Sequence, residues 1–267
     1  QISLLSEETI AAFKARGAEV TDGAFGENLV VSGYDFTKFP IGTRFTCKDV
    51  VLELTQIGKE CHHGCEIFQK MGECIMPTNG VFAKVLHGGK ISVGDEFHVQ
   101  YRAAVITLSD TASKGEREDA SGAAVEEIVG KEGYEVVLKK IIPDDGDTLT
   151  ALLSELSDED KADLILTTGG TGFSKRDNTP EATMRAVERE TPGISEAMRY
   201  YSLQITPRAM LSRGVSGIRK EALIVNLPGS PKAVKENLEA VLPSLEHGLA
   251  ILTGNASECG KPVSEGK

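Results

Sequence analysis

The stretch TTGGTGFSKRDNTPEAT, residues 167–183, combines residue types that can bind phosphate. Glycines 169, 170 and 172 let the backbone take positive φ and approach a ligand with no Cβ in the way. Consecutive backbone N–H groups in such a loop can form a nest for an anion. Thr179 is a suitable N-cap and Pro180 suits a first helical turn, so we expect the stretch to end at a positively polarised helix N-terminus.

Charged residues follow these glycines. Lys175 and Arg176 could neutralise phosphate, and Asp177 offers hard oxygen ligands of the kind that Mg²⁺ prefers. The spacing is neither that of a Walker loop nor GxGxxG. Taken by itself, the pattern is as compatible with a plain tight turn as with an anion site.

A second acidic pair, Asp144 and Asp145, ends another apolar run. Asp144 precedes Asp177 by 33 residues (177 − 144), a separation at which two strand ends of a parallel sheet can lie side by side. Two carboxylates facing one phosphate would repel it unless Mg²⁺ lies between them, and such a metal catalyses phosphoryl-type transfer. The spacing alone favours the alternative, a solvated acidic turn.

The elements that position these residues alternate between strand and helix after Tyr101. Apolar strand-like runs (AAVITLSD, EVVLKKIIP, DLILTTGG and ALIVNLPGS) are separated by helical patterns, and a helix closes the series from Pro231. This order predicts an α/β domain over residues 101–267, with a mostly parallel sheet flanked by helices. Ligands of such sheets bind at the carboxyl ends of the strands, where LSD, PDD, TTGGTG and LPGS lie.

Residues 1–100 follow a different pattern. Short alternating segments divided by Gly, Pro and Asn predict a smaller, mostly-β, barrel-like domain. One early helix is expected in SEETIAAFKARG, with Ser6 as its N-cap and Gly17 just past its end.

The second half resembles the MogA/MoaB family of molybdenum-cofactor biosynthesis. The resemblance rests on TTGGTGFSKRDNTPEAT, with LSD and IIPDD before it and SRGVSGIRKEALIVNLPGSPKAV after it, and it covers residues 102 to about 253. It implies a molybdopterin adenylyltransferase, which joins molybdopterin to the adenylyl group of Mg-ATP and releases pyrophosphate. It further implies a homotrimer that works with other proteins of cofactor biosynthesis.

The same resemblance implies site residues. The two catalytic aspartates, which also hold Mg²⁺, would be Asp144 and Asp177. The residues that bind ATP and molybdopterin would be Ser109, Asp110, Thr168, Gly169, Gly170, Thr171, Gly172, Gly229, Ser230 and Pro231.

Residues 1–99 resemble a MOSC domain in DGAFGENLVVSGYDFTKFPIGTRF, VVLELTQIGKECHHGC and CIMPTNGVFAKVLHGGKISVGDEF. Because MOSC domains usually begin earlier, we expect the start of this one to be missing. Cys61 matches the cysteine after the TQ motif, which implies a thiol that handles sulfur or contacts the cofactor. Two alternatives remain: a buried structural cysteine, and a zinc site built from Cys61, His62, His63, Cys65 and Cys74.

Composition narrows the classes of function. The net charge is −11, and both halves are acidic, which disfavours a nucleic-acid partner. No apolar run reaches the ~18 residues that a membrane span requires. An odd cysteine count without a visible signal peptide predicts a reducing compartment, and we expect the cytoplasm.

Overall fold

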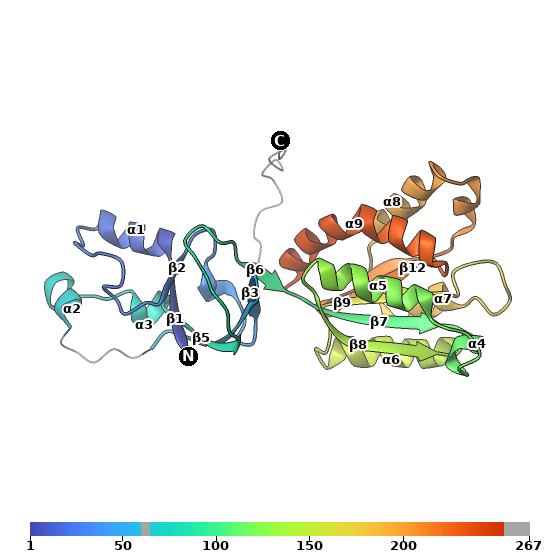
Figure 1. Ribbon diagram of the computed structural model, residues 1–267, viewed down its shortest axis with the longest axis horizontal. Helices are drawn as coiled ribbons and strands as arrows, with labels where there is room; N and C mark the ends of the chain where they lie inside the picture. The colour runs from blue at the N-terminus through green and yellow to red at the C-terminus, as the bar shows by residue number, and fades with distance from the viewer. Residues whose placement is uncertain (60–64, 254–267) are drawn as a thin grey trace. The chain divides into compact units, whose positions relative to one another are not determined.

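A computed structural model describes residues 1–59 and 65–253 of the chain. They divide into two compact units, one within residues 1–100 and the other within residues 101–253 (Figure 1). Each unit has its own six-stranded sheet and its own buried apolar clusters.

The first unit is mostly β, as the sequence predicts. Its curled sheet has the order β2-β1-β5-β4-β3-β6, in which β1 and β2 are parallel and the other neighbours are antiparallel (Figure 1). The strands are β1 (Ile2–Ser6), β2 (Leu29–Val31), β3 (Arg44–Cys47), β4 (Val50–Ile57), β5 (Val81–His87) and β6 (His98–Gln100). The helices are α1 (Glu7–Ala15), η1 (Phe36–Lys38), α2 (Glu66–Met71) and α3 (Met76–Asn79).

Helix α1 confirms the early helix predicted from the sequence. The Ser6 hydroxyl accepts a hydrogen bond from the backbone N–H of Thr9 at 3.1 Å, as an N-cap does. Gly17 follows the helix with a φ of +98°. The core beside the sheet contains an aromatic cluster in which the rings of Phe36, Phe39 and Phe45 pack at 5.0–6.5 Å between centroids.

The second unit is the predicted α/β domain. Its sheet has the order β10-β11-β12-β9-β7-β8; β12, β9, β7 and β8 run parallel, while β10 and β11 are antiparallel at one edge. The strands are β7 (Arg102–Leu108), β8 (Glu135–Ile142), β9 (Leu164–Thr168), β10 (Arg189–Glu190), β11 (Ser216–Arg219) and β12 (Ala222–Leu227). The helices are α4 (Asp110–Ser113), α5 (Ala120–Lys131), α6 (Gly146–Asp158), α7 (Thr179–Ala186), α8 (Pro192–Leu203), η2 (Pro207–Leu211) and α9 (Pro231–Leu252).

Alternation along the buried strands explains why helices cover both faces of this sheet. Ile106, Ile165 and Ile224 point to one face, where they pack in a single cluster with leucines of α6 and alanines of α7. Helices α5 and α9 pack together over the other face (Figure 1). Helix α9 turns Val234, Leu238, Val241, Leu242, Leu245 and Leu249 inward, the three- and four-residue spacing seen in the sequence.

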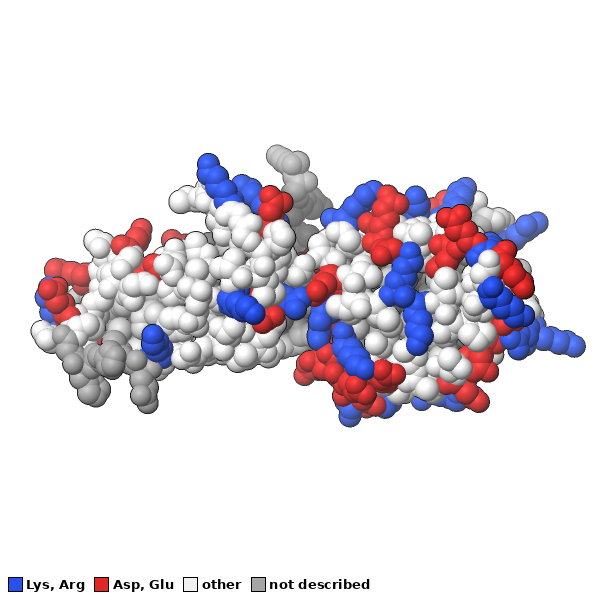
Figure 2. All heavy atoms as spheres, turned by 60° about the horizontal axis from the view of Figure 1, so that its bottom comes forward, with Lys and Arg blue, Asp and Glu red and all other residues white. Residues whose placement is uncertain are grey.

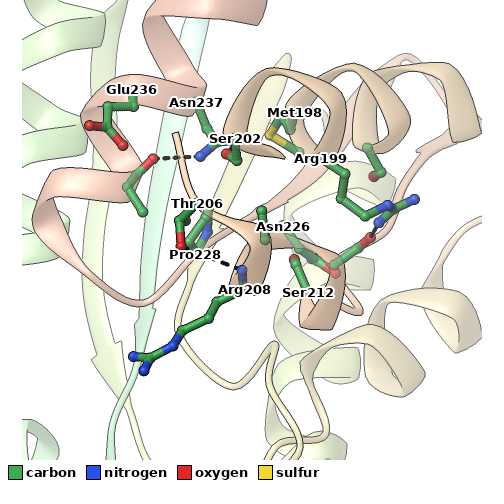
Figure 3. Close-up of a pocket in the computed structure, with 14 residues that line it drawn as sticks. Met198, Arg199, Ser202, Thr206, Arg208, Ser212, Asn226, Pro228, Glu236 and Asn237 are labelled. Atoms are coloured by element: carbon green, nitrogen blue, oxygen red, sulfur yellow. Dashed lines mark hydrogen bonds between the residues drawn. The ribbon is translucent and has the colours of Figure 1, made fainter. Parts of the chain in front are cut away.

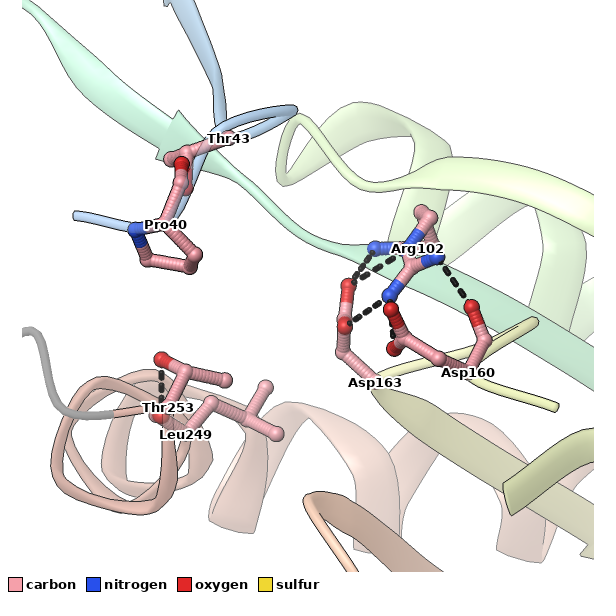
Figure 4. Close-up of polar contacts among 7 residues, drawn as sticks. All are labelled: Pro40, Thr43, Arg102, Asp160, Asp163, Leu249 and Thr253. Carbon is pink, nitrogen blue, oxygen red and sulfur yellow. Dashed lines mark hydrogen bonds and ion pairs between the residues drawn. The ribbon is translucent and has the colours of Figure 1, made fainter. Parts of the chain in front are cut away.

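Arg102, the first residue of β7, binds acidic residues that precede β9. Its guanidinium bonds both carboxylate oxygens of Asp163, at 2.7 and 3.2 Å, and also reaches the carboxylate and carbonyl of Asp160 (Figure 4). The hydrogen bonds that Arg102 donates to these carboxylates, that to Asp163 first, raise the pKa of Arg102 above its usual range. These bonds join the starts of β7 and β9, at the edge opposite the strand ends that the sequence marks as a site.

Charges on the surface of the second unit are intermixed. On the face shown in Figure 2, lysines and arginines lie among aspartates and glutamates. Many of them form ion pairs, such as Lys139–Glu126 and Lys161–Glu155, both at 2.6 Å. Among the residues that the structure describes, no helix is both long enough and apolar enough to cross a membrane.

The structure also corrects one prediction and adds elements that the sequence did not reveal. Helix α7 begins at Thr179, so Asn178 and not Thr179 holds the N-cap position, and no side chain caps that helix. Instead, the Thr179 hydroxyl donates to the carbonyl of Gly169 at 2.9 Å, which ties the helix to the glycine loop. Strands β10 and β11 and the segment containing α8 and η2 were not predicted.

Candidate functional site

Four parallel strands of the second unit end at the same edge of its sheet. Strand β7 leads into α4, β8 into α6, β9 into the glycine loop and β12 into α9. The segments that the sequence marks as site-like are the connections at this edge. We call residues 169–178, which join β9 to α7, the glycine loop.

Three of the polar side chains at this edge cap helices. Ser109 accepts from Ala112 N–H at 3.1 Å, Asp145 from Thr148 N–H at 2.7 Å, and Ser230 from Ala233 N–H at 3.2 Å. These caps leave α6 and α9 with their positively polarised N-termini at the strand ends. Asp145 therefore caps α6, whereas its neighbour Asp144 does not cap a helix.

Asp144 and Asp110 form reciprocal hydrogen bonds, in which the backbone N–H of each donates to the carboxylate of the other. The Asp110 N–H donates to Oδ2 of Asp144 at 3.0 Å, and the Asp144 N–H donates to Oδ1 of Asp110 at 3.1 Å. Arg176 bonds both oxygens of Asp110, at 2.8 and 3.0 Å. Residues from the ends of β7 and β8 and from the glycine loop therefore converge on one cluster.

The two carboxylates of this cluster differ in electrostatics. The hydrogen bond from Arg176 lowers the pKa of Asp110 below its usual value. Burial, followed by the charge of Asp110 and that of Asp177, raises the pKa of Asp144 against the opposing hydrogen bond from the Asp110 backbone. Asp144 is half-buried, so it is not the fully solvated acidic turn that its spacing favours.

The glycine loop passes close to this cluster at positions that only glycine fits. Gly169 and Gly170 take φ of +98° and +64°. A Cβ at Gly169 would lie 2.3 Å from the carbonyl oxygen of Leu108, and one at Gly170 would lie 2.3 Å from the hydroxyl oxygen of Thr179. The same Cβ at Gly170 would lie 3.6 Å from Oδ1 of Asp144, so the loop backbone runs beside that carboxylate.

Asp177 lies at the far end of the loop and folds back toward its start. Its Oδ2 accepts from the N–H of Ser174 at 2.9 Å, and its own N–H donates to the carbonyl of Ser174 at 3.0 Å. A Cβ on Gly172 would lie 2.9 Å from Oδ2 of Asp177. Gly172 therefore leaves room for this carboxylate beside the loop.

The turn after β12 packs against the start of the glycine loop. The Thr168 hydroxyl donates to the carbonyl of Pro228 at 2.7 Å, and the Ser121 hydroxyl donates to that of Gly229 at 2.8 Å. A Cβ on Gly229 would lie 3.3 Å from Cα of Gly169. Thr171 is buried, and Pro231 is the first residue of α9. The Pro228–Gly229 turn and the start of the glycine loop therefore lie against each other.

Two cavities adjoin the turn after β12, one lined by Pro228 and the other by Gly229. The smaller one, about 70 Å³, lies at the ends of β7 and β9 and includes Ser109, Thr168 and Gly169 with Gly229. Its lining also includes a run of residues that was not predicted from the sequence: Arg117, Glu118, Asp119, Ala120 and Ser121. Asp119 caps α5 through the N–H of Gly122 at 2.8 Å.

The larger cavity, about 220 Å³, lies between α8, η2 and α9, at the end of β12 (Figure 3). Its walls combine the apolar side chains of Met198, Ala209, Pro228 and Ala233 with many hydrogen-bonding groups. Those groups belong to Ser195, Arg199, Ser202, Thr206, Arg208, Ser212, Asn226, Glu236 and Asn237. A cavity with this mixture suits a flat heterocycle with several polar edges.

None of the residues that line this larger cavity was predicted as a site residue. One sequence signal was available for α8: Thr191-Pro192 repeats the Thr-Pro helix start of Thr179-Pro180. No local pattern indicates that α8 and α9 enclose a space.

Few side chains at these strand ends could serve as ligands of a metal ion. No cluster of three or more His, Cys, Asp or Glu side chains with metal-ligand geometry occurs among the residues that the structure describes. Mg²⁺, however, commonly takes only one or two carboxylates and completes its shell with substrate phosphates and water. Asp144 and Asp177, whose carboxylates lie beside Gly170 and Gly172, fit that pattern.

The cysteine cluster of the first unit is described only in part. Cys61, His62 and His63 lie outside the described residues. Cys65 is exposed and holds the N-cap position of α2, while Cys74 is half-buried. The three interpretations of Cys61, as a functional thiol, a buried structural cysteine or a zinc ligand, therefore stay predictions.

Comparison with known proteins identifies relatives of both units. Residues 104–247 match the family described as a probable molybdopterin binding domain, and residues 1–98 match the MOSC domain. The chain is similar to the molybdopterin adenylyltransferase of Helicobacter pylori strain J99, with 43% identity over 157 residues, 57% of this chain and 87% of that protein. It is similar to the enzyme of the same name from Escherichia coli K12, with 46% identity over 143 residues, 52% of this chain and 73% of that protein.

Solved structures agree with these matches. The molybdopterin biosynthesis enzyme MoaB of Thermus thermophilus superposes with a TM-score of 0.56 and 46% identity, over 58% of this chain and 98% of that one. The tungsten cofactor synthesizing protein MoaB of Pyrococcus furiosus superposes with a TM-score of 0.53 and 35% identity, over 58% of this chain and 98% of that one.

Proposed function

Because this chain belongs to the family of molybdopterin-binding domains that matches residues 104–247, we propose that it is a molybdopterin adenylyltransferase. It would transfer the adenylyl group of Mg-ATP to molybdopterin and release pyrophosphate. One observation carries the proposal: the carboxylates of Asp144 and Asp177 lie beside Gly170 and Gly172 of the glycine loop, at strand ends that also carry helix N-termini and two cavities. Relatives of the same name, from 43% to 55% identical, support it.

The proposed reaction needs positioning more than it needs a base. An oxygen of the terminal phosphate of molybdopterin attacks the α-phosphorus of ATP, and a new P–O bond joins the two. The bond between the α-phosphorus and the oxygen that bridges it to the β-phosphorus breaks, and that oxygen leaves with pyrophosphate. Since the attacking phosphate is already anionic near neutral pH, orientation and charge neutralisation suffice.

The residues at the strand ends have roles in this proposal. Backbone N–H groups of Gly169–Gly172 and the N-terminus of α9 would orient phosphate oxygens. Asp144 and Asp177 would hold Mg²⁺, which supplies charge neutralisation when bound. Arg176, now bonded to Asp110, would lower the negative potential that the carboxylates create around the phosphates.

The larger cavity is the part of this site that suits the pterin. A pterin presents an amide, an amino group and ring nitrogens around a flat ring, and the cavity offers hydroxyl, amide and guanidinium groups beside apolar walls. Its wall at Pro228 adjoins the turn at Gly229 and thus the glycine loop. A pterin bound there would direct its phosphate chain toward the loop.

The MOSC-like unit would act as an appended module that handles cofactor or sulfur. A carrier protein that binds molybdopterin without turnover is the alternative for the whole chain, and a sulfur carrier centred on Cys61 is the alternative for the first unit. The carrier predicts tight binding of pterin that is indifferent to ATP. The sulfur carrier predicts a persulfide by mass spectrometry that Cys61→Ser abolishes.

The proposal includes a homotrimer. Tyr200 on α8 and Met210 on η2 are 71% and 65% exposed, which leaves apolar surface available for contacts between copies. Sedimentation velocity measures the mass in solution directly.

The direct test incubates the purified chain with molybdopterin and Mg-ATP and follows adenylyl-molybdopterin and pyrophosphate. Wild type should form both in equal amounts, and Asp177→Asn should lower the rate by about 100-fold or more, because the loss of a direct metal ligand costs more than the 10- to 100-fold typical of a residue that only supports a ligand. Asp177→Asn keeps the size of the side chain, so its melting temperature should stay close to wild type. If wild type binds molybdopterin but forms no adenylyl product, the carrier alternative replaces the enzyme.

A further inference from the structure

A three-residue segment, Ser212–Gly214, lies between the larger cavity and the glycine loop. Ser212 and Gly214 line the cavity. Arg213, between them, directs its guanidinium away from the cavity and into the glycine loop, and its backbone N–H donates to the carbonyl of Thr171 at 2.9 Å. The segment therefore contacts both parts of the site at once.

The guanidinium of Arg213 joins the two ends of the Gly172–Asp177 turn, which lies within the glycine loop. Nε donates to the carbonyl of Gly172 at 2.6 Å, and Nη2 donates to the carbonyl of Asp177 at 2.6 Å. The remaining nitrogen, Nη1, pairs with Glu181 on α7. A planar fork of five donors can satisfy such a set, whereas an ammonium cannot span it with fixed geometry.

The same segment is also held from the cavity side. Arg199 donates to the carbonyl of Gly214 at 2.8 Å, and the side-chain oxygen of Asn226 accepts from the N–H of Val215 at 3.2 Å. Arg199, Asn226 and Ser212 all lie on the cavity wall (Figure 3). A molecule in the cavity would contact the side chains that fix the segment on which Arg213 sits.

We propose that Arg213 is a positioning residue that couples occupancy of the larger cavity to the placement of Asp177. This proposal rests on the proposed function, since it assumes that molybdopterin occupies the cavity and that Asp177 acts at the phosphates. A bound pterin restrains Ser212–Gly214, and Arg213 passes that restraint to both ends of the Gly172–Asp177 turn. The coupling is reciprocal, so an ordered turn also favours the bound pterin.

A matched control exists elsewhere in the same unit. Arg219 is half-buried like Arg213, and it likewise donates to a backbone carbonyl, that of Ala186 at 2.9 Å, and to a carboxylate, Asp158 at 2.6 and 3.0 Å. It pairs in register with Ala222 at the start of β12, which is the edge of the sheet opposite the site. Arg219→Ala therefore removes the same kinds of bonds without touching the coupling.

The first experiment measures hydrogen exchange of the full chain, with and without molybdopterin and without ATP or Mg²⁺. In wild type and in Arg219→Ala, molybdopterin should slow the exchange of amides 172–177, including that of Asp177, which bonds to Ser174. In Arg213→Ala, molybdopterin should still slow exchange along α8 but leave amides 172–177 unchanged. Arg213→Gln, which can reach only one of the two carbonyls, gives the same comparison if the alanine variant folds poorly.

The second experiment separates kcat from KM in the adenylyl-transfer assay. Arg213→Ala should lower kcat by about 10- to 100-fold, the size typical of a lost supporting contact to an active-site ligand, and, because the coupling is reciprocal, it should also raise the KM for molybdopterin by a smaller factor. Arg213→Lys should recover only part of that loss.

The outcomes separate this inference from the function on which it rests. If wild type neither binds molybdopterin nor turns it over, the proposed function fails first. If wild type is active and Arg213→Ala matches Arg219→Ala in both loop protection and kcat, Arg213 is only a structural residue and the coupling is wrong.

Discussion

Gly172→Ala is the substitution that best separates folding from chemistry in this site. The backbone of Gly172 is outside the positive-φ region, so alanine meets no conformational penalty there. The new Cβ would lie 2.9 Å from Oδ2 of Asp177 and 3.9 Å from its Cγ. To reach the 3.4 Å of an ordinary contact, the carboxylate must move by about 0.5 Å (3.4 − 2.9).

The expected effect on stability is small because two contributions oppose each other. The movement weakens the hydrogen bond from Ser174, which is worth about 0.5–1.5 kcal/mol. Replacing glycine by alanine stabilises by about 0.4–1 kcal/mol through the unfolded chain. The net change lies within about 1 kcal/mol, which for a unit of this size corresponds to a melting-temperature shift of no more than about 4 °C.

The expected effect on turnover is much larger. A displaced metal-binding carboxylate should lower the rate of adenylyl transfer by about 10- to 100-fold. The control is Gly130→Ala on the exposed side of α5, where a Cβ meets nothing within 4 Å. That variant should be stabilised by about 0.5–1 kcal/mol and keep the wild-type rate. A folded Gly172→Ala protein with wild-type turnover would refute the placement of Asp177 in the reaction.

Two further predictions concern stability. Asp144→Asn should raise the melting temperature at pH 7, because burial raises the pKa of the Asp144 carboxyl and disfavours its charged form in the folded state. Wild type is therefore most stable where this carboxyl is protonated in both states, and it loses that stability as pH rises through the folded pKa. The advantage of the variant should vanish below about pH 4, and an equal difference in melting temperature from wild type at pH 3.5 and at pH 7 would contradict the prediction. Asn226→Ala should lower the free energy of unfolding by about 2–4 kcal/mol. The buried amide donates to Thr167 and Thr183 at 2.9 Å each and accepts from Val215, and these partners would lose their bonds. Urea unfolding measures the change in free energy, and a loss below about 1 kcal/mol would show that the partners find other bonds.

Most of the architecture followed from local patterns. Runs such as DLILTT and ALIVNL are buried on both faces of the sheet, and this burial is why they read as continuous apolar strands. The capping residue Ser6 also acts as its sequence context predicts. Thr179 did not, because its hydroxyl is used by a tertiary bond to Gly169, which no local rule anticipates.

The sequence by itself determined the class of the second unit, the strand ends that form the candidate site, and the glycines that permit a close approach. These depend on the chemistry of residues near one another in the chain. The tertiary structure decided which of them meet: Asp144 with Asp110 through reciprocal backbone bonds, and Arg213 with both ends of the Asp177 turn. It also decided that α8, η2 and α9 enclose the larger cavity. Such contacts join residues tens of positions apart, and packing between elements, which leaves no local signature, is what selects them.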